Sequence, residues 1–177
     1  MRRAPDGRVQ TNTRIRSKIL ITSAICDQTI FRENVRFREI DMNAIPTDLN
    51  ETFDFCWSAC CLEHLGSIKH GLDFIVKSTR LLRRGGVAVH TTEFNLSSND
   101  ETIESRDLSL LRRRDIEAVV DRLEASGCHV EKIDWSQGHG FLDGYIDLPP
   151  YKQEPHLRLK IGDFDCTSIG LIITKRV

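Results

Sequence analysis

The sequence predicts an α/β domain built on a mostly parallel sheet. From residue 53 onward, apolar strand patterns alternate with helical patterns, and this alternation is typical of parallel strands joined by right-handed crossovers. The run 53–94 shows the order most plainly, because it reads strand, helix, Gly-Gly turn and strand. Another helix pattern and two further strand patterns follow it.

The first strand and helix of this run have clear limits. Phe53–Trp57 is mainly apolar, which is the pattern of a parallel strand covered on both faces. Ser67 suits the N-cap of the helix, Gly85-Gly86 is expected to end it, and Val87–Thr92 forms the next strand. Apolar or small residues recur at helical spacing between these limits, at Ile68, Leu72, Ile75, Val76, Thr79 and Leu82.

A second helix is predicted over 113–126, with Gly127 at its carboxyl cap. Two strands, Val130–Trp135 and Ile169–Thr174, should follow. The connection 136–168 between them shows no clear helix and is long for a plain loop, so we expect a lobe that carries function or is poorly ordered. Its aromatic residues would suit a sugar, an aromatic small molecule or a peptide equally, and they are Phe141, Tyr145 and Tyr151. The same lobe holds His139 and Asp143, for which a solvated loop is favoured over a substrate or metal contact.

The amino-terminal part is less regular. Residues 1–18 carry six basic side chains against the single acid Asp6, and we favour a disordered basic tail over a transit peptide or a nucleic-acid arm. The segment 19–30 suits a helix or a strand. A short strand is expected over Val35–Ile40, ending at Asp41-Met42. The domain prediction is therefore a tail over 1–18 and one partial α/β domain over 19–177.

Composition limits the functional classes. The chain has 177 residues, of which 40% are hydrophobic and 29% are charged, which suits one soluble globular domain. A net charge of −1 gives no general footprint for nucleic acid. No apolar stretch is long enough for a membrane span, and the amino end lacks the apolar region of a secretory signal. We therefore expect a cytoplasmic protein without nucleic-acid or membrane partners.

The cysteines do not indicate disulfides or a metal centre. In the absence of a secretion signal, reduced thiols are favoured. Cys56, Cys60 and Cys61 with His64 do not show the paired spacing of a structural zinc site. The sequence therefore predicts no metal, and it gives no reason for a lowered thiol pKa that would make Cys60 or Cys61 a nucleophile.

From Val35 to Lys175 the chain resembles the carboxyl-terminal part of a class I S-adenosylmethionine-dependent methyltransferase. The segments that carry the resemblance are IDMNAIP, FDFCWSACCLEHL, LLRRGG, VAVHTTE, RRDIEAVVDRLEASGC and GLIITKR. Arg84 stands where the family usually has proline before the glycine pair. The resemblance implies an incomplete Rossmann-like sheet, mostly parallel with an antiparallel carboxyl-terminal strand and with helices on both faces.

The resemblance also implies which residues bind S-adenosylmethionine. Asp41 and Met42 match the positions that hold the adenine, where a carboxylate accepts from the exocyclic amine and a thioether packs on the ring. Ser58, Ala59 and Cys60 match the strand end beside the methionine moiety. Ligands of open α/β sheets bind outside the carboxyl ends of the strands, which agrees with these positions.

Methyl transfer from a sulfonium is an in-line displacement, so the protein mainly positions the acceptor and adds a base where the acceptor carries a proton. His64 is the first candidate for this base, because an unperturbed imidazole titrates near neutral pH. Glu93 is the second, and His90 is a weaker one. The alternative for His64 is a hydrogen-bonded structural residue.

The family's glycine-rich turn between the first strand and first helix has no match, since Gly7 is the only glycine before Val35. The strand Val35–Ile40 must then pair with Phe53–Trp57 or find a complementing chain, and an apolar edge or face would stay uncovered. Three hypotheses follow: a truncated methyltransferase with little activity alone, one half of a split enzyme, and a non-catalytic interaction protein. Self-association is expected, and a small-molecule or glycan acceptor is possible for an active form.

Overall fold

The computed structural model describes residues 26–152 and 156–176, which belong to two compact units, Met1–Asp41 and Met42–Val177. In the first unit, helix α2 spans Gln28–Asn34 and is capped by Asp27, whose Oδ1 accepts from the backbone N–H of Thr29 at 2.8 Å. The ambiguous segment 19–30 is therefore helical from Gln28, while residues 19–25 lie outside the described part.

The strand predicted over Val35–Ile40 is wrong. Residue Val35 closes helix α2 with extended dihedral angles, but no ladder pairs the segment 35–40 with any described strand. The Arg36 guanidinium turns back to the carbonyl oxygen of Arg32, 2.7 Å away. A strand is stable only when its backbone groups find a ladder partner, and the alternating pattern of this segment does not supply one.

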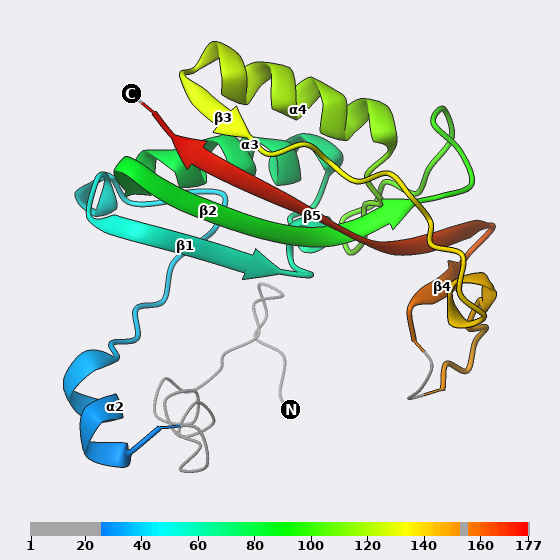
Figure 1. Cartoon of the computed structure of the whole chain (residues 1–177), viewed down its shortest axis with the longest axis horizontal. Helices are drawn as coiled ribbons and strands as arrows, with labels where there is room; N and C mark the ends of the chain where they lie inside the picture. Colours follow the sequence, from blue (N-terminus) through cyan, green and yellow to red (C-terminus); the bar gives the residue numbers. More distant parts are fainter. Residues whose placement is uncertain (1–25, 153–155, 177) are drawn as a thin grey trace. The chain divides into compact units, whose positions relative to one another are not determined.

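The second unit holds a sheet whose path is β1-β2-β5-β3, with β4 added on β5. Strands β1 and β2 are parallel, and β5 is antiparallel to β2, β3 and β4. Four strands thus run in one direction and the last runs against them, which confirms a mostly parallel sheet with an antiparallel carboxyl-terminal strand (Figure 1). The strand bounds are Phe53–Ala59 for β1, Leu82–Asn95 for β2, Cys128–Val130 for β3, Arg158–Ile161 for β4 and Phe164–Lys175 for β5.

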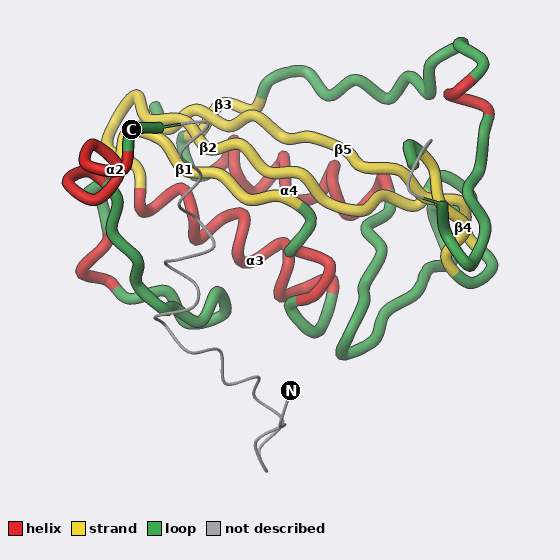
Figure 2. Tube along the Cα trace, turned by 90° about the horizontal axis from the view of Figure 1, so that it is seen from below, coloured by secondary structure: helices red, strands yellow, loops and turns green. Residues whose placement is uncertain are grey.

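Helices α3 (Ile68–Ser78) and α4 (Arg113–Ala125) lie on the same face of this sheet (Figure 2). The expectation of helices on both faces is wrong for residues 42–152 and 156–176. The chain steps from β1 to β2 and then past β5 to β3, always in the same direction across the sheet. Right-handed crossovers that advance in one direction place their helices on one face. None of the described helices is long and apolar enough to cross a membrane.

The glycine pair lies inside strand β2 and does not end helix α3. The helix ends at Ser78, a 3-10 turn covers Thr79–Leu81, and β2 already begins at Leu82. The pairing register of β1 and β2 shifts between Phe53 and Phe55, beside the glycines. A Cβ on Gly86 would lie 2.9 Å from the carbonyl oxygen of Arg83 and 3.0 Å from that of Asp54. Glycine is needed here because another backbone approaches closely.

The later elements agree with the sequence in kind but differ in length. Helix α4 matches its prediction, and Gly127 has a positive φ of 83° after it. Strand β3 keeps only Val130 of the predicted Val130–Trp135, because the chain leaves the sheet at Glu131. The long connection contains a 3-10 turn over Leu142–Gly144 and the short strand β4, which forms a hairpin with β5.

The sheet face opposite the helices is open in the second unit, and β1 is an edge strand with its only ladder to β2 among the described strands. Trp57 is 70% exposed and Phe55 is 55% exposed, so the prediction that β1 is covered on both faces is wrong. Val87 and Val89 pair with these two aromatic residues, and Ile172 pairs with Val89 from the other side. We call these five residues the open apolar face.

Candidate functional site

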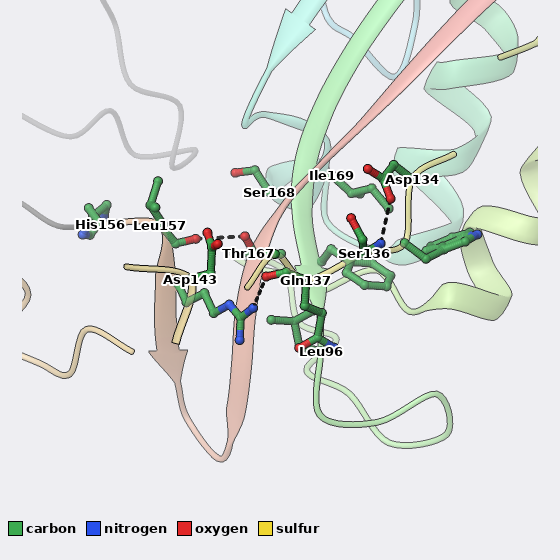
Figure 3. Close-up of a pocket in the computed structure, with 14 residues that line it drawn as sticks. Leu96, Asp134, Ser136, Gln137, Asp143, His156, Leu157, Thr167, Ser168 and Ile169 are labelled. Carbon is green, nitrogen blue, oxygen red and sulfur yellow. Dashed lines mark hydrogen bonds between the residues drawn. The ribbon is translucent and has the colours of Figure 1, made fainter. Parts of the chain in front are cut away.

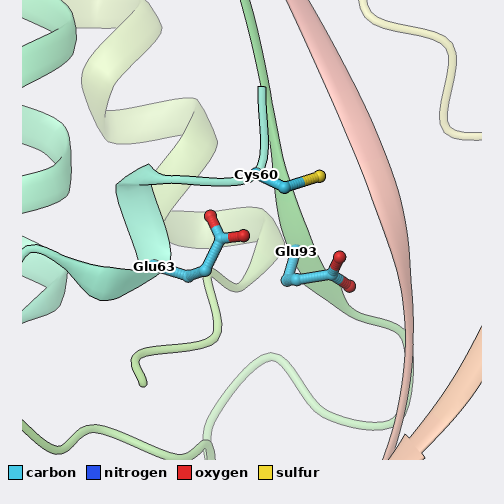
Figure 4. Close-up of side chains that lie close together, drawn as sticks. All are labelled: Cys60, Glu63 and Glu93. Carbon is cyan, nitrogen blue, oxygen red and sulfur yellow. The ribbon is translucent and has the colours of Figure 1, made fainter. Parts of the chain in front are cut away.

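Three ligating side chains meet where strands β1 and β2 end. One ligand atom each of Cys60, Glu63 and Glu93 lies within 4.8 Å of the others (Figure 4). Cys60 directly follows β1, Glu63 lies in the 3-10 turn Leu62–His64, and Glu93 lies near the end of β2. We call these residues the thiol-carboxylate cluster. It occupies the edge of the sheet where α/β proteins bind ligands.

Glu63 is the buried member of the cluster, with 1% of its surface exposed. The turn that carries it is anchored by Leu62, which is completely buried in the core. The Glu63 carbonyl accepts from the backbone N–H of Ser109 at 2.8 Å, and its Oε2 accepts from the Thr92 hydroxyl at 2.9 Å. Hydrogen bonds to both its backbone and its side chain therefore hold Glu63 in place.

Glu93 follows Thr92 on strand β2, points to the sheet face opposite the helices, and is half-buried. Burial raises the pKa of its carboxyl group, and the negative charge of Glu63 raises it further, while His156, His64 and Ser168 act in the opposite direction. In the ladder, Glu93 stands opposite Ser168 of β5. A carboxyl group with a raised pKa at the end of a strand is suited to proton transfer.

Cys60 is the exposed member and has a positive φ of 45°, which is uncommon outside glycine. Its backbone N–H bonds to the carbonyl oxygen of Thr91 at 3.0 Å, which continues the pairing of β1 with β2 by one residue. The tight turn then sends its Sγ to within 4.0 Å of the Ser168 hydroxyl. Ser168 thus lies beside both Cys60 and Glu93.

A cavity of about 400 Å³ is lined in part by Ser168. Strands β4 and β5, the end of β2 and the loop 134–143 bound it (Figure 3). Phe94 and Trp135 form an aromatic pair in its wall, with ring centroids 5.6 Å apart. Its lining mixes apolar and polar groups, including His156, Arg158 and Ser168.

The polar groups of the cavity wall are anchored by hydrogen bonds. The Arg158 guanidinium donates to the carbonyl oxygen of Gln137. The Asp143 carboxylate accepts from the backbone N–H of Gly140 at 2.7 Å, and this bond closes the turn over residues 140–143. His156 Nδ1 lies 3.1 Å from Oδ2 of the buried Asp147. The predicted lobe therefore does border a cavity, although Phe141 is 92% exposed and does not line it.

His64, the first candidate base, is exposed and lies outside the cluster. Its Nδ1 is 2.7 Å from the carbonyl oxygen of Asp107, so that nitrogen carries a proton and donates it to the backbone. This bond fixes the loop around Asp107 against the turn 62–64. His64 acts on Glu93 through its charge. His90, the weaker candidate, is buried in the core and is 1% exposed.

Of the residues expected to bind the cofactor, Met42 and Ser58 are turned toward the core of the second unit. Ser58 Oγ is 2.7 Å from His90 Nδ1, so its hydroxyl is directed under the helices. Met42 packs on the core of the second unit, whereas Asp41 belongs to the first unit. Ala59 and Cys60 do lie at the end of β1. The cavity described above is lined by none of the five, and no glycine-rich strand-turn-helix precedes β1 in the described part of the chain. The described residues of the second unit therefore do not by themselves fit an S-adenosyl group.

Sequence reasoning missed three residues of this region. Glu63 was not among the predicted site residues, and Ser168 and His156 lie in the connection 136–168, for which only a functional or poorly ordered lobe was predicted. Glu63 had one usable indication, since it follows the end of a strand at the ligand-binding edge. Ser168 had none, because its position depends on the antiparallel pairing of β5 with β2.

No protein-family model matches the sequence, and no curated protein matches it. Among solved structures, the chain is similar to a putative methyltransferase from Bacillus halodurans, with 13% identity, a TM-score of 0.51, and coverage of 82% of this chain and 79% of that one. At this identity the likeness shows the fold alone, which is similar to that of this putative methyltransferase. The chain is also similar to the [4+2]-cyclase SpnF, at 19% identity and a TM-score of 0.43, over 60% of this chain and 38% of the cyclase.

Proposed function

We propose that this chain forms the acceptor-binding side of an S-adenosylmethionine-dependent methyltransferase. The methyltransferase-like fold supports the family. The observation that carries the proposal is the cavity beside Ser168, which adjoins the thiol-carboxylate cluster at the carboxyl ends of β1 and β2. An acceptor in this cavity would lie at the edge of the sheet where α/β enzymes perform their chemistry.

Within this proposal, Glu93 is the proton acceptor. It lies in the ladder opposite Ser168, a lining residue of the cavity, and its pKa is raised by burial. His64 is less suited, because its Nδ1 is already bonded to the carbonyl oxygen of Asp107. A carboxylate within hydrogen-bond reach of an acceptor hydroxyl or amine removes its proton as the methyl group is transferred.

The proposal also requires that groups outside the described residues complete the cofactor site. Met42 packs on the core of the second unit and the Ser58 hydroxyl bonds to His90, so neither side chain is directed to an adenosine pocket within that unit. The cofactor contacts would then come from another polypeptide or from a segment beyond residues 26–152 and 156–176. The split-enzyme hypothesis is the form of the proposal that the open edge of β1 supports.

Calorimetry of the purified chain with S-adenosylmethionine and with its demethylated product tests the cofactor part. We expect no binding at micromolar concentration. Binding of that strength would show that this chain holds a complete cofactor site, and the split-enzyme form of the proposal would then be wrong.

Fluorescence tests the acceptor part separately. The chain has two tryptophans, and Trp135 lines the cavity while Trp57 lies on the open face. In the W57F variant, Trp135 is the remaining tryptophan. When phenols, sugars and short peptides are added in turn, the class of compound that binds in the cavity should change the emission of Trp135. Substituting Arg158→Ala should weaken that change, whereas Arg83→Ala, at the other end of β2, is the matched control. A panel without any response would contradict an acceptor cavity.

A non-catalytic interaction protein is the second candidate. The open apolar face favours it, since Phe55, Trp57 and Ile172 are each about half exposed or more and such patches often mark interaction sites. A stable complex that persists in the E93Q and S168A variants would favour this candidate over the enzyme.

A further inference from the structure

We propose that the thiol-carboxylate cluster binds a divalent zinc ion through Cys60 Sγ and the carboxylates of Glu63 and Glu93. No metal is predicted here from the sequence, because Cys56, Cys60, Cys61 and His64 lie close together in the chain and lack the spacing of a structural zinc site. The structure adds Glu93 from the next strand of the sheet, so three ligands of two types that zinc accepts, one thiolate and two carboxylates, now lie within 4.8 Å of one another.

The state of Glu63 is an independent indication of a missing cation. Its side chain is 1% exposed, and among the described residues its hydrogen-bond donor is the neutral Thr92 hydroxyl. Within residues 26–152 and 156–176, no lysine, arginine or histidine forms an ion pair with it. Buried carboxylates are normally paired with a cation or coordinate a metal. The other two members of the cluster are a second carboxylate, from Glu93, and a thiol, from Cys60, and neither carries a positive charge.

The geometry needs only small side-chain adjustments. Zinc lies about 2.3 Å from cysteine sulfur and about 2.0–2.2 Å from carboxylate oxygen. In a tetrahedral ion, two such ligand atoms are therefore separated by about 3.4–3.7 Å. The ligand atoms, which lie within 4.8 Å of one another, must approach by up to about 1.4 Å when the ion binds. Cys60 and Glu93 are not fully buried, so rotation of their side chains can close the remaining difference.

Supporting contacts hold the ligands as metal sites require. Ligating carboxylates are usually fixed by a further hydrogen bond, and the Thr92 hydroxyl provides this bond to Glu63. The backbone of Glu63 is fixed through Ser109 N–H, and that of Cys60 through the carbonyl oxygen of Thr91. Two of the three ligands are thus positioned by the main chain.

The ligand set favours zinc over magnesium or calcium. Magnesium and calcium take oxygen ligands, whereas a thiolate selects zinc and other softer metals. Three protein ligands also leave one position of a tetrahedral ion open, as in catalytic zinc sites. Ser168, which borders both the cluster and the cavity, lies beside that ion. In the metal-loaded chain Glu93 is a ligand, so its role as a proton acceptor belongs to the metal-free chain alone.

Cobalt substitution tests this site without any activity assay. The full chain, freed of metal with a chelator, is titrated with Co²⁺ and followed by absorption. We expect a single bound equivalent with a sulfur-to-cobalt charge-transfer band, and displacement of the cobalt by Zn²⁺. The C60S variant should lose the band, and E93Q should bind Zn²⁺ at least about tenfold more weakly.

C61S is the matched control, because Cys61 is the neighbouring thiol and lies outside the cluster. It should keep the band and the wild-type affinity. T92V should lower the affinity by about 10–100-fold through the lost hydrogen bond to Glu63. Circular dichroism of each variant separates loss of metal from loss of fold. A wild-type chain without the band, or a band that persists in C60S, would overturn the proposal.

Discussion

Ser58 and His90 are joined by a hydrogen bond of 2.7 Å between Oγ and Nδ1. The other ring nitrogen of His90, Nε2, lies 2.9 Å from Ser78 Oγ. Ser78 uses its own proton on the carbonyl oxygen of Ile75, 2.7 Å away, so it accepts from His90 Nε2–H. His90 Nδ1 must then accept from Ser58. A single neutral tautomer of His90 thus links β1, β2 and α3 inside the core.

This arrangement predicts lower stability in acid. Burial lowers the pKa of His90 to about 4, whereas the unfolded chain has the usual value near 6.5. Between these pH values the unfolded chain binds a proton that the folded chain does not, so the stability falls as the pH is lowered from about 6.5 towards about 4. The difference is on the order of 3 kcal/mol.

Urea unfolding at several pH values measures this effect. In the H90N variant, the part of the pH dependence between 4 and 6.5 that His90 causes should disappear. An unchanged pH profile in H90N would show that other groups cause the acid sensitivity.

Removing the Ser58 hydroxyl should also destabilise the fold. In S58A, His90 Nδ1 keeps its buried position and loses its donor, which costs about 1–3 kcal/mol. The free energy of unfolding at neutral pH measures the loss. Ser136→Ala is the control, because Ser136 and its hydrogen-bond partner Asp134 are both exposed to solvent. Equal stability of S58A and the wild type would contradict the assigned tautomer.

Gly86 should not tolerate a side chain. A Cβ there would lie 2.9 Å from one carbonyl oxygen and 3.0 Å from another, and both belong to the backbone. We expect G86A to lose about 1–3 kcal/mol through overpacking of the β1-β2 pair. Gly170→Ala is the matched control, because a Cβ at Gly170 has no neighbour within 4 Å. Thermal unfolding of both variants compares the two sites, and a stable G86A would mean that β1 can shift along β2.

The start of helix α4 depends on Asp115. Its Oδ2 accepts from the backbone N–H of Arg112 at 2.9 Å and from Arg112 Nε at 2.7 Å. Both side chains are mostly buried, with 14% exposed for Arg112 and 11% for Asp115. We expect D115A to lose about 1–2 kcal/mol, whereas E117A, which breaks the exposed pair with Arg113, should lose less than about 0.5 kcal/mol. Denaturant midpoints of the two variants check this, and similar losses would contradict it.

The open apolar face should drive association. Trp57 is 70% exposed on the edge strand β1, so W57S should leave the free energy of unfolding nearly unchanged and reduce self-association. Sedimentation velocity over a range of concentrations measures the mass. Trp135→Phe is the control, because Trp135 packs on Phe94 away from this strand. A concentration-independent monomer in the wild type would contradict this prediction.

The sequence by itself located four elements of the second unit, β1, α3, α4 and β5, because each of them buries one regular stripe against the core. The limits of β1 and α4 agree with the prediction to within two residues, whereas α3 ends at Ser78 instead of at Gly85 and β5 begins at Phe164 instead of at Ile169. The sequence also placed Glu93 at the functional edge, since the carboxyl ends of parallel strands share that edge. The expected pairing of Val35–Ile40 failed, because a local pattern does not contain the strand partner.

Only the tertiary structure decided which distant residues meet. The antiparallel pairing of β5 with β2 brings Ser168 to Glu93, and the turn after β1 brings Glu63 under Thr92. These contacts join residues 29 to 75 positions apart in the sequence, for example 63 with 92 and 93 with 168. Which residues meet depends on the pairing register of the strands, and hydrogen bonds across the sheet set that register. Both crossover helices also pack on the same face of the sheet. Local periodicity records neither of these, so the cluster and its cavity appear only in the folded chain.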